Sequence, residues 1–386
     1  ILIWFNFNQA PTNSESDIIN ATTELEPSAR DNLTKTDFVE PDLSVLKSKI
    51  ESYYLSNDYL KIKFSNLGAS VQEVIIKNYV TYDSLDLKLI NELDFNFSFF
   101  LKNKKINTNQ IVFNEVVEKN NKISFSFQDE NNNSIKFIYE LIPDSYQLTF
   151  HVVTEEGNSY LEPDKLIWSQ KINQLEKNLD NERNSTTINY SFDDKSSKQL
   201  SLVKDVEKAV NSPTWIAYKQ QFFSTILYSR QAFGASNIST YTPESDEYVK
   251  SLKSELSVEY NNQNNEYFFD FYFVPNKYAL LKPLDKGFES LIPLGWGIFG
   301  WVNKLLIIPM FNFLEKFSLN YGVIILIIAV VIKLLLFWPT KSSYLSMAKM
   351  RVLKPEIDAL NEKIKDPMQR QQAQMNLYKK TGVNPM

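Results

Sequence analysis

Few residues in this chain could carry out bond chemistry. Its 386 residues include no cysteine and a single histidine, His151. Disulfides, thiolate zinc sites and cysteine nucleophiles are therefore excluded, and any histidine catalysis would depend on one residue. Glycine is scarce, with 9 residues, and neither the dinucleotide-binding nor the P-loop pattern occurs. We expect no catalytic residue, no metal site, no cofactor and no small-molecule substrate.

One cation has an unusual setting. Residues 321–338 carry a single charge, Lys333, and the ten residues before it are all apolar. A helix of 18 residues is about 27 Å long, close to the hydrocarbon thickness of a bilayer. A lysine inside such a helix costs about 3 kcal/mol at the membrane centre. Its ammonium could snorkel to the interface or face a polar environment within the membrane, and the pattern leaves both open.

The segment that positions Lys333 is predicted to be a transmembrane helix over residues 319–339. A buried core helix is the alternative, but core helices seldom run so long without a polar residue. Tyr321 and Trp338 lie at the two ends, where aromatic interface anchors are expected. Pro339 should end or kink the helix.

Charge is distributed unevenly about this helix. Residues 341–386 hold nine Lys or Arg and four Asp or Glu, whereas the rest of the chain holds 32 and 42. Because basic flanks stay in the cytoplasm, the C-terminal side is predicted to be cytoplasmic and the acidic portion outside. The net charge of −5 argues against a nucleic-acid substrate.

The N-terminal residues indicate a second contact with the membrane. Residues 1–8, beginning ILIWFNF, are predicted to be the end of a first transmembrane helix, with a processed signal remnant or a short strand as alternatives. Residues 9–42 are rich in Ser, Thr, Asn and acidic residues, which predicts a flexible acidic linker.

The largest block, residues 43–286, has the pattern of an all-β domain. Apolar and polar residues alternate in several short segments separated by turn signals: 59–64, 122–127, 134–139 and 146–152. Residues 267–273 are dense in aromatics, which favours a strand buried on both faces, and one helix is expected near 203–210. The block predicts a single large antiparallel sandwich.

Residues 287–318 are predicted to form an amphipathic helix in the membrane interface. Apolar residues recur there at three- and four-residue spacing: Phe299, Val302, Leu306, Met310, Phe313 and Phe317. Pro309 should bend or divide the helix. A helix packed against the sandwich is the alternative.

Residues 340–386 are predicted to form a cytoplasmic helical hairpin. The first helix has an apolar rhythm at Met350, Leu353, Ile357, Leu360 and Ile364. Pro367 can begin the second helix, in which Met368, Met375 and Tyr378 should share one face, and Gly382 should end it. Five cations are candidate contacts for substrate or ribosome, with a solvated structural hairpin as the alternative: Lys349, Arg351, Lys354, Lys363 and Arg370.

Several strings resemble the YidC family of membrane protein insertases. The string SYLSMAKMR at 343–351, with Leu353 and Pro355, resembles the motif that follows the second membrane helix of that family. The closing LYKK at 377–380 and GVNP at 382–385 fit it as well. Upstream, NLGASVQEVII at 66–76, WSQ at 168–170 and WIAYKQQFF at 215–223 resemble its large periplasmic domain.

The resemblance implies a fold, a function and partners. The periplasmic domain would be a β-supersandwich similar to galactose mutarotases. The protein would be a chaperone and insertase of the bacterial inner membrane, multi-pass, serving nascent membrane proteins with the ribosome and the Sec translocon. Lys333 falls where the family has a positive residue, usually arginine, that faces a hydrophilic groove. Further membrane helices would follow Met386.

Two other functions are weighed against this one. Mutarotases use a histidine and a glutamate across a sugar cleft, but His151 lies in an alternating strand pattern with no evident partner set. A membrane-tethered periplasmic binding module is the runner-up, in which the sandwich does the work and the helix is an anchor.

Overall fold

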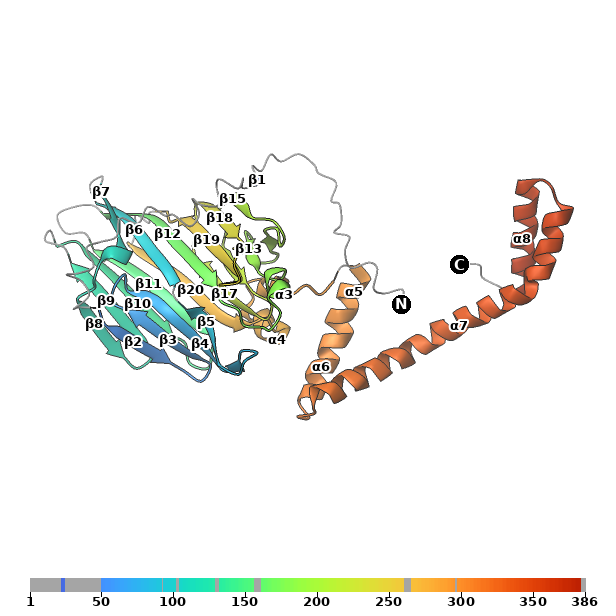
Figure 1. The fold of residues 1–386 in the computed structure, drawn as a ribbon, viewed down its shortest axis with the longest axis horizontal. Coiled ribbons are helices and arrows are strands. Elements are labelled where there is room, and N and C mark those ends of the chain that lie inside the picture. The colour runs from blue at the N-terminus through green and yellow to red at the C-terminus, as the bar shows by residue number, and fades with distance from the viewer. Residues whose placement is uncertain are drawn as a thin grey trace. The chain divides into compact units, whose positions relative to one another are not determined.

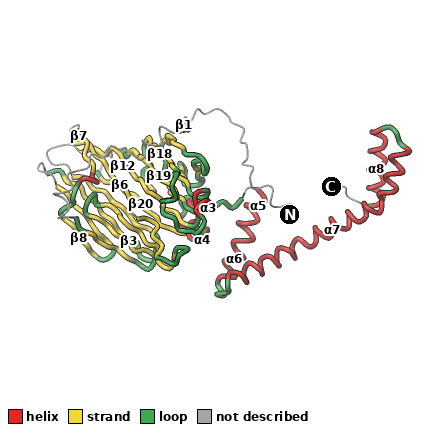
Figure 2. Tube along the Cα trace, in the orientation of Figure 1, coloured by secondary structure: helices red, strands yellow, loops and turns green. Residues whose placement is uncertain are grey.

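The computed structural model describes most of the chain, namely residues 22–24, 50–91, 93–101, 104–128, 132–155, 161–259, 265–295 and 297–382. The chain divides into two compact units, Ile1–Ile292 and Pro293–Met386. The first holds all the described strands and the second is helical (Figures 1 and 2). The predicted N-terminal membrane segment, residues 1–8, lies outside the described residues.

The first unit contains three antiparallel sheets (Figure 1). The nine-stranded sheet has the spatial order β14 (Lys198–Gln199), β13 (Thr187–Ser191), β16 (Trp215–Lys219), β17 (Phe223–Ser229), β20 (Glu266–Pro275), β11 (Gln147–Glu155), β10 (Ser134–Leu141), β9 (Lys122–Gln128) and β8 (Glu115–Lys119). The seven-stranded sheet has the order β1 (Thr22–Glu24), β15 (Val206–Asn211), β18 (Ala235–Tyr241), β19 (Lys250–Ser257), β12 (Leu161–Ile172), β6 (Leu93–Leu101) and β7 (Lys104–Asn107). The four-stranded sheet has the order β2 (Ser52–Ser56), β3 (Leu60–Ser65), β4 (Ser70–Val80) and β5 (Asp86–Asn91).

Aromatic side chains join these sheets into one two-layer core. Phe95 of the seven-stranded sheet packs edge-on against Phe150 of the nine-stranded sheet, with ring centroids 5.6 Å apart. Phe64 of the four-stranded sheet lies 4.9 Å from Tyr139, also of the nine-stranded sheet. Both smaller sheets therefore cover the inner face of the largest, and the buried residues between the sheets form one cluster. The prediction of an all-β sandwich is confirmed, as is the burial of β20 on both faces.

The helix predicted near residues 203–210 is wrong. Val206–Asn211 form strand β15, which pairs with β18. Val206 and Val210 are both buried, and a spacing of four residues places them on one face of a strand as well as of a helix. In the predicted linker, Thr22–Glu24 form the short strand β1 on the edge of β15.

A short cap ends the first unit and covers part of the outer face of the nine-stranded sheet. It contains α4 (Tyr278–Leu281) and two 3₁₀ turns, Lys282–Leu284 and Phe288–Leu291. Phe288 is fully buried, with its ring against those of Trp215 and Tyr272. Residues 287–292, which were predicted to begin the interfacial helix, therefore pack with the β unit instead.

The interfacial region itself is one helical run over Gly297–Glu315 that contains a π turn. It consists of α5 (Gly297–Val302), a π-helical turn (Asn303–Ile307) and α6 (Ile308–Glu315). Pro309 stands in the first turn of α6, directly after the π turn, but Ile307 and Ile308 keep a helical backbone, so the predicted division at this proline is not seen. A π turn adds about one residue to the helical repeat, which shifts the phase of the apolar stripe between α5 and α6.

The rest of the second unit consists of α7 (Tyr321–Lys363) and α8 (Pro367–Thr381). Helix α7 does not end at Pro339, which lies within it together with Pro355. A proline removes one backbone hydrogen bond, and the long helical runs on both sides keep the helix continuous. The first arm of the predicted hairpin is therefore a continuation of the predicted transmembrane helix. Gly382, with φ of 61°, caps α8 as predicted.

Candidate functional site

Lys333 lies on the free face of helix α7. The opposite face packs within the second unit, where α6 and α7 are in contact and Ile324 and Ile328 are buried. Lys333 is nine residues beyond Ile324, which corresponds to a rotation of about 180° around the helix. Its side chain is exposed. The local fold thus directs the one charge of the apolar segment away from the packed face.

The N-terminal end of α7 is fixed by a cap and by an aromatic pair. The Asn320 side chain accepts a hydrogen bond from the Gly322 amide at 2.8 Å. The Tyr321 ring stacks on Phe311 of α6 at 5.9 Å, and its hydroxyl donates to Glu315 at 3.1 Å. The predicted anchor at this end is therefore also a contact between α6 and α7.

The second predicted anchor, Trp338, is 83% exposed. Together with Leu335, Leu336 and Phe337 it leaves an apolar surface uncovered around the C-terminal half of the apolar segment. Among the described residues, Gly297–Glu315 and α7 are the two helices long and apolar enough to cross a membrane by length and composition.

The two helices of the hairpin meet on the face of α7 that the spacing of its apolar residues predicts. Leu353 is buried, and Met350, Ile357, Leu360 and Ile364 are half-buried. The Gln374 side-chain amide of α8 donates to the Asn361 side-chain oxygen of α7 at 2.7 Å. Figure 1 shows α8 beside the last turns of α7. Pattern analysis missed this polar pair, since an Asn and a Gln 13 residues apart give no periodic signal.

The structure divides the face predicted for α8, because Met368 and Met375 share an exposed face whereas Tyr378 lies on the half-buried side. Met368 and Met375 are 80% and 58% exposed, so they point away from α7. The inward residues are instead Arg370, Ala373, Gln374, Leu377 and Tyr378. These recur at three- and four-residue spacing, so they lie on one side of α8.

Four of the five predicted hairpin cations are freely exposed. Lys349, Arg351, Lys354 and Lys363 project into solvent, whereas Arg370 is half-buried in the hairpin. None of the five forms an ion pair with another residue of the described helices. Their charges are therefore available to a partner.

His151 has a neighbour that the sequence pattern did not reveal. It lies on β11 opposite Phe268 of β20, and the two rings stack with centroids 4.2 Å apart. Its Nε2 is 3.5 Å from a carboxylate oxygen of Glu266, which is too long for a good hydrogen bond. Burial lowers the pKa of the imidazole, against the opposing effect of Glu266. This favours the neutral ring near pH 7.

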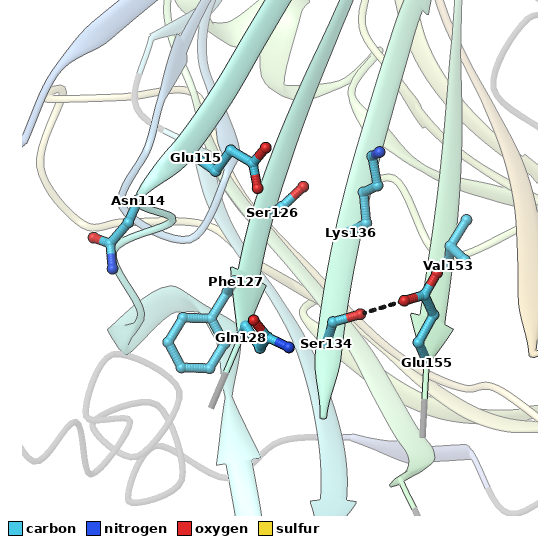
Figure 3. A pocket seen from close by; sticks show the side chains of 9 residues that line it. All are labelled: Asn114, Glu115, Ser126, Phe127, Gln128, Ser134, Lys136, Val153 and Glu155. Atoms are coloured by element: carbon cyan, nitrogen blue, oxygen red, sulfur yellow. Dashed lines mark hydrogen bonds between the residues drawn. The ribbon is translucent and has the colours of Figure 1, made fainter. Parts of the chain in front are cut away.

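A shallow depression of about 410 Å³ lies nearby, at the end of β8 to β11. Figure 3 shows Glu115, Ser126 and Lys136 projecting from neighbouring strands, with the Ser134 hydroxyl donating to Glu155 at 3.3 Å. Its lining contains no histidine, and no predicted site residue lies in it. Across the described residues there is no cluster of three or more His, Asp or Glu side chains that could hold a metal.

A buried carboxylate was also missed. Glu182 of α3 (Leu179–Arg183) is 1% exposed and accepts the Leu175 amide with both oxygens, at 3.1 and 3.2 Å. Burial raises the pKa of this carboxyl group to about 7. Glu182 is flanked in the sequence by acidic and polar residues, as in an exposed surface helix, so the sequence pattern did not indicate that it is buried.

Two family models match the chain. One, described as the YidC periplasmic domain, covers residues 53–309, and the other, described as 60Kd inner membrane protein, covers residues 313–386. The first model therefore spans the described β unit from residue 53 and continues to the start of α6, and the second spans α7 and α8.

Curated relatives agree with these models. A membrane protein insertase YidC of Parabacteroides distasonis is 37% identical over 353 residues, which is 86% of this chain and 56% of the relative. A protein of the same name from Amoebophilus asiaticus is 37% identical over 86% of this chain and 59% of its own length. One from Azobacteroides pseudotrichonymphae is 32% identical over the whole chain and 68% of its own length. The chain thus spans little more than half the length of the first two.

Solved structures give a more distant likeness to the β unit. A galactose mutarotase-like protein from Lactobacillus casei is 11% identical, with a TM-score of 0.42 over 58% of this chain and 100% of that one. A galactose mutarotase related enzyme from Lactobacillus acidophilus is 11% identical, with a TM-score of 0.36 over 58% and 97%. Likenesses at this level carry no argument about chemistry.

Proposed function

This chain belongs to the YidC family of membrane protein insertases, and from that premise we propose that it inserts nascent proteins into the bacterial inner membrane and helps them fold. It is a membrane protein. The regions proposed for it are a membrane helix ending near residue 8, a linker at 9–42, a periplasmic sandwich, an interfacial helix, the transmembrane part of α7 and a cytoplasmic hairpin.

The orientation of Lys333 carries this proposal. The apolar part of α7 packs on α6 through one face and turns its only charge to the other. A cation held within an apolar membrane segment supports a hydrophilic groove there rather than a lipid contact, because such charges almost always face a bundle interior or a water-filled cavity. Lysine keeps the positive charge of the family's usual arginine but lacks its planar fork, so the role is a general positive potential.

The proposed mechanism is partitioning without bond chemistry. A hydrated groove that reaches part-way through the bilayer receives the polar tail of a client and shortens the apolar distance that this tail must cross. Lys333 attracts acidic residues in the tail, and the apolar segment of the client then moves into lipid along the groove wall.

The hairpin is the proposed first contact on the cytoplasmic side. Its four free cations, Lys349, Arg351, Lys354 and Lys363, are exposed without ion pairs among the described residues, which supports binding to the ribosome or to acidic client segments. Cooperation with the Sec translocon is proposed from family membership. The match of a family model to residues 313–386 favours an insertase over a tethered binding module, because α7 and α8 are then more than an anchor.

Catalysis by the sandwich is not part of the proposal. His151 and Glu266 lie side by side on adjacent strands, whereas mutarotase chemistry places its acid and base on opposite sides of a sugar. The interfacial position of α5 and α6 stays a proposal, supported by their exposed apolar side chains.

Site-specific photocrosslinking tests the groove. A probe at residue 333 of the full-length protein should capture a client during insertion. The matched control is a probe at Ile328, five residues earlier on the packed face, which should capture none. If the probe at residue 333 captures no client while insertion itself is intact, the proposed groove at Lys333 is refuted.

A further inference from the structure

One end of the β unit carries large apolar side chains that are exposed on two neighbouring loops. Val80 ends β4, and Tyr82 and Leu85 lie in the turn that leads to β5; they are 63%, 53% and 62% exposed. Phe222, in the turn between β16 and β17, is 51% exposed. We call these four residues the apolar tip. Single exposed apolar residues are ordinary, but a group of them marks a contact with a protein or a membrane.

The two loops of the apolar tip are held side by side by their neighbouring residues. The ring of Tyr79 packs edge-on against that of Phe223, with centroids 5.3 Å apart. The Lys277 ammonium lies over the same Tyr79 ring, 6.0 Å from its centroid. The Asn276 amide donates to the Phe222 carbonyl oxygen at 2.8 Å. The apolar tip therefore adjoins the start of the cap, and Figure 1 shows β4, β5 and α4 at the same end of the β unit.

The turn between β4 and β5 is ordered although its apolar side chains are exposed. The Thr81 amide donates to the Leu85 carbonyl oxygen and the Ser84 amide to that of Thr81, both at 2.9 Å. The Tyr82 amide donates to the carbonyl oxygen of Leu175, in the segment before α3, at 3.1 Å. Main-chain hydrogen bonds thus fix the turn without burying Tyr82 or Leu85. Packing of the β unit does not explain why these side chains are apolar.

The cap connects the apolar tip with the part of the chain that can enter a membrane. It begins beside Lys277 and ends at Ile292, which packs in the same cluster as Leu281 and Phe288. Four residues separate Ile292 from Gly297, where a helical run long and apolar enough to cross a membrane begins. The five steps from Ile292 to Gly297 span at most about 18 Å. The chain therefore passes from this end of the β unit to that run without a long linker.

We propose that the apolar tip inserts into the headgroup region of the bilayer and anchors the β unit to the lipid surface. This inference rests on the proposed function, in which the β unit lies outside the membrane that α7 crosses. A tyrosine has an apolar ring and a polar hydroxyl, which suits the interface, and Leu85 and Phe222 can reach the acyl boundary. Residues 78–86 contain Asp83 and Asp86 but no Lys or Arg. The contact would therefore depend on apolar insertion and not on anionic lipids.

The test measures lipid contact of a fluorophore in the full-length protein. Residues 1–386 contain no cysteine, so once any cysteine beyond them is replaced a single one can carry an environment-sensitive label. The protein is reconstituted in phosphatidylcholine vesicles that contain nitroxide-labelled lipid. The label at Ser84→Cys, in the turn, should be quenched by this lipid.

Val117→Cys is the matched control position. Val117 is also apolar and 53% exposed, but it lies on the edge strand β8, five strands from β17 in the same sheet. This separation corresponds to about 24 Å. A label at residue 117 should not be quenched by the nitroxide lipid.

Two variants separate apolar insertion from other causes of quenching. Leu85→Ser with Phe222→Ser should lower the quenching at residue 84 about tenfold, since two inserted apolar side chains are lost. Leu85→Met with Phe222→Leu should retain it, because the apolar tip stays apolar. Both variants should unfold at the wild-type temperature, since these side chains are exposed. High salt and added phosphatidylglycerol should leave the quenching unchanged.

The contrary outcomes are equally specific. Equal quenching at residues 84 and 117, or equal quenching of the Ser variant and the wild type, would overturn the proposal. Quenching that requires phosphatidylglycerol and is lost in high salt would overturn it as well, because the contact would then be electrostatic. Shielding of residue 84 from a soluble quencher in native membranes but not in pure lipid would also overturn it, by identifying a protein partner. Client insertion in the same vesicles tests the insertase function separately: normal insertion without lipid contact at residue 84 overturns only the anchor, whereas lipid contact without insertion overturns only the proposed function.

Discussion

Reversing the charge at Lys333 should change which clients are inserted. Its side chain projects from the free face of α7, about 7.5 Å along the helix before Trp338, the predicted interface anchor. At about 6 Å and an effective dielectric constant of about 20, a lysine and a client carboxylate attract by about 3 kcal/mol. This is on the order of a hundredfold in the occupancy of the groove by an acidic tail.

The assay compares insertion of two clients that differ only in one tail residue, aspartate or lysine. With Lys333→Glu, the aspartate client should insert far less and the lysine client more, while Lys333→Arg should resemble wild type. Lys341→Glu is the matched control, because it makes the same charge change eight residues later. Equal insertion of both clients by all variants would refute the electrostatic role and favour simple snorkelling of Lys333.

Three further predictions concern stability. Burial raises the pKa of Glu182 in the folded protein to about 7, so the protonated carboxyl group contributes to folding stability fully below its ordinary pKa of 4.5, and this contribution is lost as pH rises toward 7. Relative to Glu182→Gln, the unfolding free energy of the sandwich in urea should therefore fall by up to about 3 kcal/mol between pH 4.5 and 7. Gly287→Ala should destabilise the same domain by about 2–5 kcal/mol in urea titration, since φ is 70° and a Cβ would lie 2.5 Å from the Asp194 carbonyl oxygen. Asn361→Ala should loosen the hairpin by about 1 kcal/mol through loss of the bond from Gln374, seen as faster amide exchange in α8 but not in the membrane part of α7.

The alternation of apolar and polar residues predicted the sandwich, because each strand buries one face in a core shared by the sheets and exposes the other. Lys122–Gln128 and Ser134–Leu141 bury alternate residues as their sequences indicate. The error at Val206–Asn211 has the same physical origin, since the spacing of Val206 and Val210 fits both a helix and a strand. Pairing with β18, 29 residues later, decides between them, and no local pattern contains that information.

The part of the candidate site that could be predicted from the sequence is the part that amino-acid composition alone determines. A single charge in an apolar segment identified Lys333, but the face on which it lies follows from packing between α6 and α7. Met368 and Met375 show the limit in the other direction. Their spacing predicted a face shared with Tyr378, but the contact of α8 with α7 takes Tyr378 and leaves both methionines outside. An exposed apolar residue is ordinary on surfaces, so hydrophobicity does not indicate which side of a thin hairpin is covered.

The continuity of α7 has a mechanical consequence. Its 43 residues extend over about 65 Å, whereas a bilayer core needs about 30 Å, so roughly half of the helix projects beyond the predicted membrane segment. The carbonyl of Leu335 lacks a helical donor because Pro339 has no amide hydrogen, and the carbonyl of Arg351 lacks one because of Pro355. One weakened point therefore lies at the predicted interface and another within the first arm of the hairpin. A client bound to the hairpin therefore acts on the same helix that carries Lys333, through a joint that can bend without breaking. That arrangement would let capture in the cytoplasm and entry into the groove proceed as one continuous movement along α7.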